Sequence, residues 1–172
     1  MRNLPDNIVL EGFMGVGKTT IGKAVAERLG YLFIDIDDEV KNMAGISIHD
    51  MLQNGDLSLV RSWENKVCKN LVGSKNKVIA TGGGVFTNEE NALLLRKNNF
   101  VVCLERDFDT VYRIISNDPN RVMAYKRSYE EIKNLLDGRT EIYRRNADYI
   151  ISVKNIYETT KAIIDEYIKK HK

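Results

Sequence analysis

The sequence is poor in cysteine and in long hydrophobic runs, and both shortages exclude classes of protein. Its 172 residues contain two isolated cysteines, Cys68 and Cys103, with no cysteine or histidine partner at metal-ligand spacing. Neither a disulfide framework nor a zinc site is therefore expected. No stretch approaches the roughly 18 apolar residues of a membrane span, and no signal peptide precedes the first apolar run. We expect a cytoplasmic protein with no membrane partner.

An excess of charge of one sign is also absent. Lysine and arginine number 26 against 24 aspartates and glutamates, a formal net charge of +2. Charge balance therefore gives no reason to expect a nucleic acid partner. Only two prolines occur, and no Ser/Gly/Pro-rich linker divides the chain. Residues 1–172 are therefore predicted to form a single domain.

The most informative stretch runs from Gly12 to Thr20 and fits the phosphate-binding P-loop pattern. Two glycines separated by four residues let backbone N–H groups turn toward an anion. The lysine that follows adds a charge for the β- and γ-phosphates, and the next hydroxyl can ligate Mg²⁺. An apolar strand precedes the loop and a helical pattern follows it, so the helix N-terminus would face the phosphates. The predicted nucleotide-binding residues are Gly12, Gly15, Val16, Gly17, Lys18, Thr19 and Thr20.

Short apolar runs alternate with helical patterns along the chain, which predicts an α/β fold with a mostly parallel sheet covered on both faces. In such sheets ligands bind beyond the carboxyl ends of the strands. The expected strands are 8–10, 32–36, 78–81, 100–104 and 149–153. The expected helices are 19–29, 59–71, 88–97, 108–116, 129–145 and 156–170.

Carboxylates follow the second predicted strand. Asp35 and Asp37, two apart at a strand end, would project to the same side, beside the P-loop. Asp35 could then hold a Mg²⁺-bound water, and Asp37 could accept a hydrogen bond from a substrate hydroxyl. Asp38 and Glu39 suit a helix start, where acidic side chains interact favourably with the helix dipole.

The third predicted strand ends in the triple glycine Gly82–Gly84, where a substrate can approach bare backbone. The third strand lacks the acidic residue that usually assists Mg²⁺ binding in a Walker B strand, so Asp35 is expected to take that role. Residues 45–58 are long enough for a separate helical substrate subsite, and a turn at Ser116 opens a segment predicted to be mobile up to Ser128.

Arginines are the remaining candidates for substrate binding. A planar guanidinium suits a carboxylate or phosphate, so a few arginines at strand ends could hold an acidic substrate. One in the mobile segment, Arg121, could swing over the transferring phosphoryl group. Composition does not choose among Arg61, Arg113, Arg121, Arg127, Arg139, Arg144 and Arg145. Glu11, in the strand before the P-loop, stands where an apolar residue is expected, and the sequence offers no account of it.

Taken together, these motifs resemble those of the shikimate kinases over essentially the full length of the chain. The matching stretches are Gly-Phe-Met-Gly-Val-Gly-Lys-Thr-Thr (12–20), Phe-Ile-Asp-Ile-Asp (33–37), Arg-Ser-Trp-Glu (61–64), Ala-Thr-Gly-Gly-Gly (80–84), and Arg139 with Tyr143 and Ala147. The resemblance implies a three-layer αβα P-loop kinase fold with a five-stranded parallel sheet. It also implies a helical substrate-binding region at about 35–64 and a mobile lid at about 116–128.

The resemblance further implies ATP-dependent phosphorylation of the 3-hydroxyl of shikimate, in aromatic amino acid biosynthesis, by a monomeric enzyme. Asp37 would orient the substrate hydroxyls, and Lys18 and Arg121 would stabilise the phosphoryl group. Arg113 would stack on adenine, while Thr19 directly and Asp35 through water would position Mg²⁺. The implied substrate-binding residues are Asp37, Arg61, Gly82, Gly83, Gly84 and Arg139.

The chain departs from the family pattern in three places, one of which is Glu11 in the strand before the P-loop. Val60 stands where the family usually has phenylalanine, and Arg121-Val122-Met123-Ala124 replaces Arg-Pro-Leu-Leu, which leaves Arg127 as a substitute for Arg121. A related P-loop kinase for another polyhydroxy acid, such as gluconate, is the alternative within enzymes, ahead of a nucleoside monophosphate kinase. A GTP-dependent switch would need an Asn-Lys-x-Asp stretch, which is absent. A non-catalytic relative is disfavoured because the chain retains the residues that the reaction would need: Lys18, Thr19, Asp35, Asp37, Arg61 and Arg139.

Overall fold

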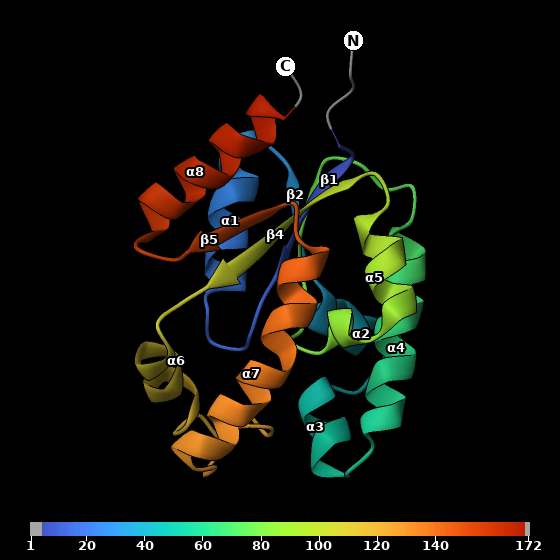
Figure 1. Cartoon of the computed structure of the whole chain (residues 1–172). Coiled ribbons are helices and arrows are strands. Elements are labelled where there is room, and N and C mark those ends of the chain that lie inside the picture. The colour runs from blue at the N-terminus through green and yellow to red at the C-terminus, as the bar shows by residue number, and fades with distance from the viewer. Residues whose placement is uncertain (1–4, 171–172) are drawn as a thin grey trace.

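The structure, a computed structural model, describes residues 5–170 and is organised around one five-stranded parallel sheet (Figure 1). The strands lie in the order β2-β3-β1-β4-β5, with the strand that leads into the P-loop at the centre. Every strand predicted from the sequence is present. Their bounds are β1 Asn7–Glu11, β2 Leu32–Asp35, β3 Lys77–Ala80, β4 Asn99–Glu105 and β5 Tyr149–Ser152.

Helices cover both faces of this sheet, which confirms the three-layer prediction. Helices α1 and α8 pack together on one face, and α4, α5 and α7 lie on the other (Figure 1). The six predicted helices are present within one or two residues of their expected ends. The bounds are α1 Lys18–Leu29, α2 Ile36–Ala44, α3 Ile48–Gln53, α4 Leu57–Leu71, α5 Glu89–Arg96, α6 Phe108–Ile115, α7 Tyr129–Asn146 and α8 Ile156–Lys169, with a short 3₁₀ helix η1 at Val85–Thr87.

The central strand lies entirely in the core. Ile8, Val9 and Leu10 are fully buried, and the neighbouring strand β4 buries its apolar run from Phe100 to Leu104. A parallel strand covered by helices on both faces has no solvent side, which explains runs of apolar residues in place of alternation. The rigid core thus fixes the carboxyl ends of β1, β3 and β4 beside one another.

The boundary between β2 and α2 differs from the prediction. The strand ends at Asp35, and Ile36 already belongs to the helix. The cause is local, because the Asp35 carboxylate accepts a hydrogen bond from the Asp37 backbone N–H and caps the helix. The expectation that Asp35 and Asp37 project together from a strand end was therefore wrong. Asp38 and Glu39 do lie in the first helical turn, as predicted.

Two segments lie beyond the carboxyl ends of the strands. The stretch 45–58, predicted to be a helical subsite, contains α3 and the beginning of α4, whose cap is Asp56. Residues 116–128 connect α6 to α7 without a regular helix and are anchored by the buried Ala124. We refer to residues 116–128 as the lid segment.

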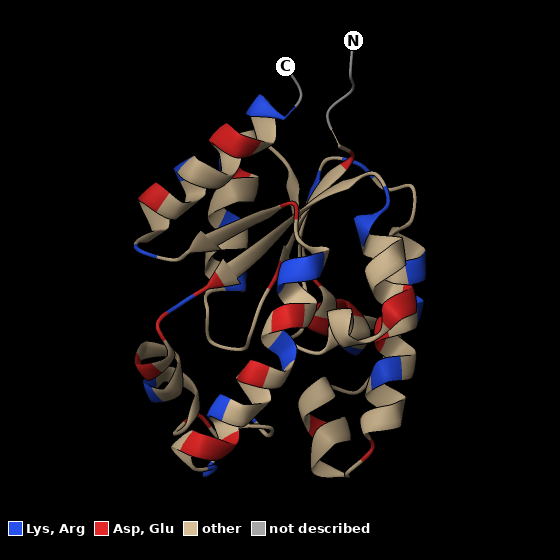
Figure 2. Ribbon diagram, in the orientation of Figure 1, with Lys and Arg blue, Asp and Glu red and all other residues tan. Residues whose placement is uncertain are grey.

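Acidic and basic residues are mixed along the helices, as Figure 2 shows clearly for α7 and α8. Pairs one helical turn apart, such as Lys133–Asp137 at 2.6 Å and Lys161–Asp165 at 2.5 Å, are exposed ion pairs. Such pairs contribute little to stability. None of the helices in the described part of the chain is both long and apolar enough to span a bilayer.

Candidate active site

The P-loop lies between β1 and α1 and depends on glycine at three positions. Gly12, Gly15 and Gly17 have φ values of 137°, 80° and 108°, in the region that other residues rarely adopt. A Cβ on Gly12 would also collide with the Leu104 carbonyl oxygen, and one on Gly15 would lie 2.6 Å from the Ile115 side chain. The loop is therefore wedged against β4 and α6 in the shape that the sequence motif predicts.

Lys18 folds back over this loop. Its Nζ donates hydrogen bonds to the carbonyl oxygens of Gly12 at 2.7 Å and Phe13 at 2.8 Å. Burial lowers the pKa of Lys18 to about 8, although the negative charge of Asp37 acts in the opposite direction. The ammonium group is thus held at the loop where a phosphate chain would lie.

Thr19 and Asp35 meet beside the loop and offer oxygen ligands. The Thr19 hydroxyl donates to the Asp35 carboxylate at 2.9 Å. Among residues 5–170 no group of three or more His, Cys, Asp or Glu side chains could hold a metal by itself. One hydroxyl and one carboxylate fit Mg²⁺, which proteins commonly hold through one or two side chains together with the substrate phosphates.

A cavity of about 280 Å³ is lined by all the predicted substrate-binding residues. It opens between the P-loop, α2, α3, α4, α7 and the lid segment, and it includes Met14 from the P-loop. Residues separated by about 100 positions in the chain therefore face one space. The predicted residues that line it are Asp37, Arg61, Gly82, Gly83, Gly84, Arg121 and Arg139.

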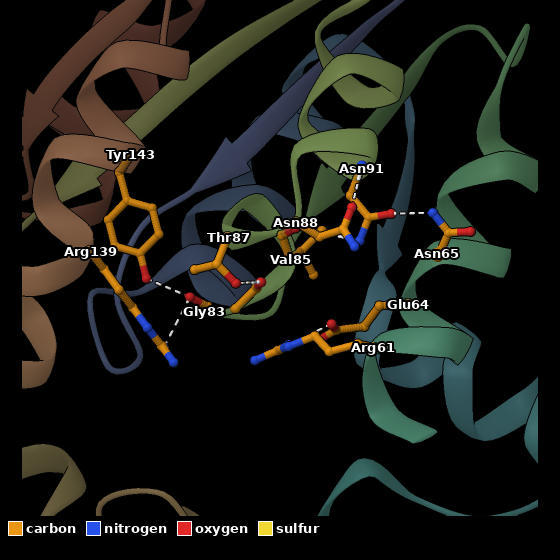
Figure 3. A network of polar contacts seen from close by, with 11 residues as sticks. Arg61, Glu64, Asn65, Gly83, Val85, Thr87, Asn88, Asn91, Arg139 and Tyr143 are labelled. Carbon is orange, nitrogen blue, oxygen red and sulfur yellow. Dashed lines mark hydrogen bonds and ion pairs between the residues drawn. The ribbon is translucent and has the colours of Figure 1, made fainter. Parts of the chain in front are cut away.

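The triple glycine forms part of this cavity's wall, and Figure 3 shows Gly83 with Arg139 and Tyr143 bonded to it. The Gly83 carbonyl oxygen accepts hydrogen bonds from Arg139 Nη1 at 3.1 Å and from the Tyr143 hydroxyl at 2.5 Å. The Arg61 guanidinium lies so close to Gly84 that a Cβ there would collide with it. The absence of a side chain at Gly84 therefore lets Arg61 approach the same stretch of backbone that Arg139 contacts at Gly83.

Asp37 faces the cavity from the first turn of α2. Its side chain is exposed to the cavity but surrounded by protein, and this loss of water raises its pKa to about 6. The carboxylates of Asp35 and Glu64 act in the same direction, whereas Lys18 and Arg121 partly offset them. At neutral pH Asp37 is mainly ionised and can accept a hydrogen bond from a hydroxyl.

The lid segment distinguishes Arg121 from Arg127. Arg121 lines the cavity and lies 3.5 Å from Asp118 through its Nε. Arg127 does not line the cavity, and its carbonyl oxygen accepts a hydrogen bond from the Tyr112 hydroxyl. The geometry therefore favours Arg121 as the lid arginine.

Two of the predicted nucleotide-binding residues have exposed side chains. Arg113 is exposed on α6, where it donates to the Asp109 carbonyl and to the Thr110 hydroxyl, both at 3.3 Å. Thr20 is exposed in the first turn of α1. Their proposed contacts with the nucleotide remain predictions.

Two polar residues of the site were not among the predicted site residues. Glu64 is buried and pairs with Arg61 at 2.5 Å, and burial raises its pKa while Arg61 acts against that rise. Tyr143, named above only among the stretches that match the family, donates a hydrogen bond to the Gly83 carbonyl oxygen. The i,i+3 spacing of Arg61 and Glu64 on a helix is a signal that could have identified the pair.

Glu11 occupies an unusual position at the end of β1. Its side chain is fully buried, and neither carboxyl oxygen has a hydrogen-bond partner among residues 5–170. Burial raises its pKa to about 9, with Lys18 and Arg96 acting in the opposite direction. The carboxyl group is thus neutral at physiological pH and destabilises the fold, because its hydrogen-bonding groups are unpaired.

Glu11→Leu is therefore expected to raise the free energy of unfolding by about 1–3 kcal/mol through the unpaired polar burial alone, with a further pH-dependent gain at pH 7. The folded-state pKa of about 9 lies above the ordinary 4.5, so native stability falls as pH rises between these values. Urea denaturation should give a larger gain at pH 8 than at pH 5. Glu11→Gln should give only the pH-dependent part of this gain, because the amide does not titrate but remains a buried polar group. A leucine variant no more stable than the parent at pH 8 would contradict this account.

Comparisons with known proteins agree on one family. The shikimate kinase family model matches residues 14–172. A shikimate kinase of Caldanaerobacter subterraneus is 41% identical over 166 residues, which cover 95% of this chain and 96% of the relative. One of Persephonella marina is 38% identical over 160 residues, covering 92% and 96%.

Solved structures give the same picture. The shikimate kinase of Acinetobacter baumannii in complex with shikimate superposes with a TM-score of 0.90 at 30% identity, covering 98% of this chain and 96% of that chain. A gluconokinase of Sinorhizobium meliloti reaches a TM-score of 0.56 at 16% identity, which shows a shared fold alone. This chain, with its P-loop and its arginine-lined cavity, therefore belongs to the shikimate kinase family.

Proposed function

We propose that this protein transfers the γ-phosphoryl group of ATP to the 3-hydroxyl of shikimate, yielding shikimate 3-phosphate and ADP. The observation that carries this function is the meeting of Asp37, Arg61 and Arg139 in one cavity beside the P-loop. The cavity thus contains one carboxylate that can accept a hydrogen bond from a substrate hydroxyl and two guanidinium groups that can bind a substrate carboxylate. Family membership agrees with this reaction.

Arg61 and Arg139 would bind the substrate carboxylate. They reach the cavity from α4 and α7, and both lie against the Gly83–Gly84 backbone. Two guanidinium groups match the planar carboxylate and offer charge-assisted hydrogen bonds. Glu64 would keep Arg61 oriented through its ion pair.

Asp37 would bind the hydroxyl that accepts the phosphoryl group and take up its proton as the new P–O bond forms. Lys18 and Arg121 would stabilise the charge on the phosphoryl oxygens, because catalysis of this transfer rests mainly on positioning and electrostatics. Thr19 directly and Asp35 through water would hold Mg²⁺, which would supply further neutralisation of the phosphate charge. Arg113 would stack on adenine.

The same proposal covers the organisation of the protein. We infer a monomeric, cytoplasmic enzyme in which residues 1–172 form a single domain with a lid. In support, the P-loop, the acid-binding arginines and the lid arginine all come from one chain. Aromatic amino acid biosynthesis is the expected pathway.

Arg139→Leu tests the acid-binding role. Loss of a charge-assisted hydrogen bond costs about 1.5–3 kcal/mol, so the KM for shikimate should rise by about 10–100-fold. The KM for ATP should stay within about twofold, because Arg139 donates its hydrogen bond to Gly83 and is assigned to the substrate carboxylate, not to the phosphates. Arg145→Leu, an exposed change on the same helix, is the matched control. An unchanged shikimate KM in the Arg139 variant would remove this residue from substrate binding.

A further inference from the structure

Asn91 is a fully buried polar residue that the catalytic mechanism does not use. It lies in the first turn of α5, and its side chain is 0% exposed. Its Oδ1 accepts a hydrogen bond from Asn65 Nδ2 at 2.8 Å, and its Nδ2 donates to the Val85 carbonyl oxygen at 3.4 Å (Figure 3). A buried amide with both ends bonded is costly to disturb.

These hydrogen bonds connect the two elements that form the acid-binding wall. Asn65 follows Glu64 on α4, one helical turn after Arg61. Val85 follows the triple glycine and begins η1, whose turn is closed by a hydrogen bond from the Thr87 hydroxyl to the Gly84 carbonyl oxygen at 2.6 Å. Neither asparagine lines the cavity. The two amides therefore contact the elements of the acid-binding wall on the side away from the cavity.

The spacing between α4 and the glycine turn matters because Arg61 already rests against Gly84. A Cβ at Gly84 would collide with the Arg61 guanidinium, so the clearance between them is small. A Cβ at Gly82 would likewise lie 3.4 Å from Glu64 Oε1 and 2.7 Å from Asp37 Oδ1. A shift of α4 relative to this turn would move Arg61 and its partner Glu64 together relative to Gly83.

We propose that the Asn65–Asn91 amide bridge is a positioning element for the substrate carboxylate, holding Arg61 on α4 at the correct distance from the Gly82–Gly84 turn. The proposal rests on the proposed function, because the ligand it positions is the acid end of shikimate. It predicts that breaking the bridge weakens binding of the acidic substrate and leaves the nucleotide half of the site intact.

Asn65→Leu is the first test, since Asn65 is only half-buried and the bond from Asn91 to Val85 stays in place. The KM for shikimate should rise by roughly tenfold, since misplacement by about 1 Å costs up to 10²-fold. The KM for ATP should change by less than about twofold. Asn70→Leu, an exposed change on the same helix, should leave both values unaltered. General destabilisation would lower the amount of active enzyme without separating the two KM values.

A double-mutant cycle provides the second test. Asn91→Leu should raise the shikimate KM at least as much as Asn65→Leu. The double variant should be no worse than Asn91→Leu alone, because Asn65→Leu breaks the same bridge and, besides it, only an exposed hydrogen bond from Asn65 Nδ2 to Glu90 Oε2. Additive effects, or a folded Asn65→Leu enzyme with an unchanged shikimate KM, would overturn the positioning role. Absence of shikimate-dependent ADP release in the parent enzyme would instead overturn the proposed function, and the bridge's role with it.

Discussion

Lys18→Met is expected to lower kcat by about 10³-fold or more, the scale on which charge stabilisers act in phosphoryl transfer. That loss corresponds to roughly 4 kcal/mol of transition-state stabilisation. Methionine keeps most of the side-chain length but removes the ammonium group that bridges the Gly12 and Phe13 carbonyls at the P-loop. A single-turnover or steady-state ADP-release assay measures the effect.

Lys23→Met is the matched control for this substitution. Lys23 lies on the exposed side of the same helix, away from the phosphate loop. Its loss should change kcat by less than about twofold, as expected of a surface position. A decrease of under tenfold in the Lys18 variant would contradict the role assigned to Lys18.

Asp37→Asn is expected to reduce phosphoryl transfer by about 10²–10⁴-fold, the range in which a positioned proton acceptor contributes. The amide keeps the size of the carboxylate but cannot take the proton of the substrate hydroxyl. Because Asp37 would bind the acceptor and make no phosphate contact, ATP affinity should remain nearly unchanged. Calorimetric titration with ATP and an ADP-release assay separate these two quantities.

Glu39→Gln, in the same first helical turn but outside the residues that line the cavity, is the corresponding control. It should retain turnover close to that of the parent enzyme. Turnover that is unchanged in the Asp37 variant would exclude Asp37 from the mechanism. Loss of ATP binding together with activity would show that Asp37 supports the P-loop and does not act on the acceptor.

The fold was largely predictable because its signals are local. Apolar strands, helical spacing and the glycines of the P-loop each act over a few residues, and all five strands were found. The error at the end of β2 has a local cause. Ile36 is apolar and fully buried, so it looks like a strand residue, yet the Asp35 cap begins the helix one residue earlier.

The site was less predictable because it depends on contacts between distant elements. Composition could not select Arg61 and Arg139 among the arginines, since their shared feature is contact with the Gly83–Gly84 backbone. Resemblance to the family made that selection. The buried state of Glu11 likewise follows from its place in the central strand, and a local pattern could only mark it as out of place.

Acceptor specificity is the most direct test of the central claim. ADP release should be measured with shikimate, gluconate and nucleoside monophosphates side by side, and the phosphorylated position of the product should be read by NMR. The account predicts release that depends on shikimate and a product phosphorylated at the 3-hydroxyl. Stimulation by gluconate and not by shikimate would contradict it.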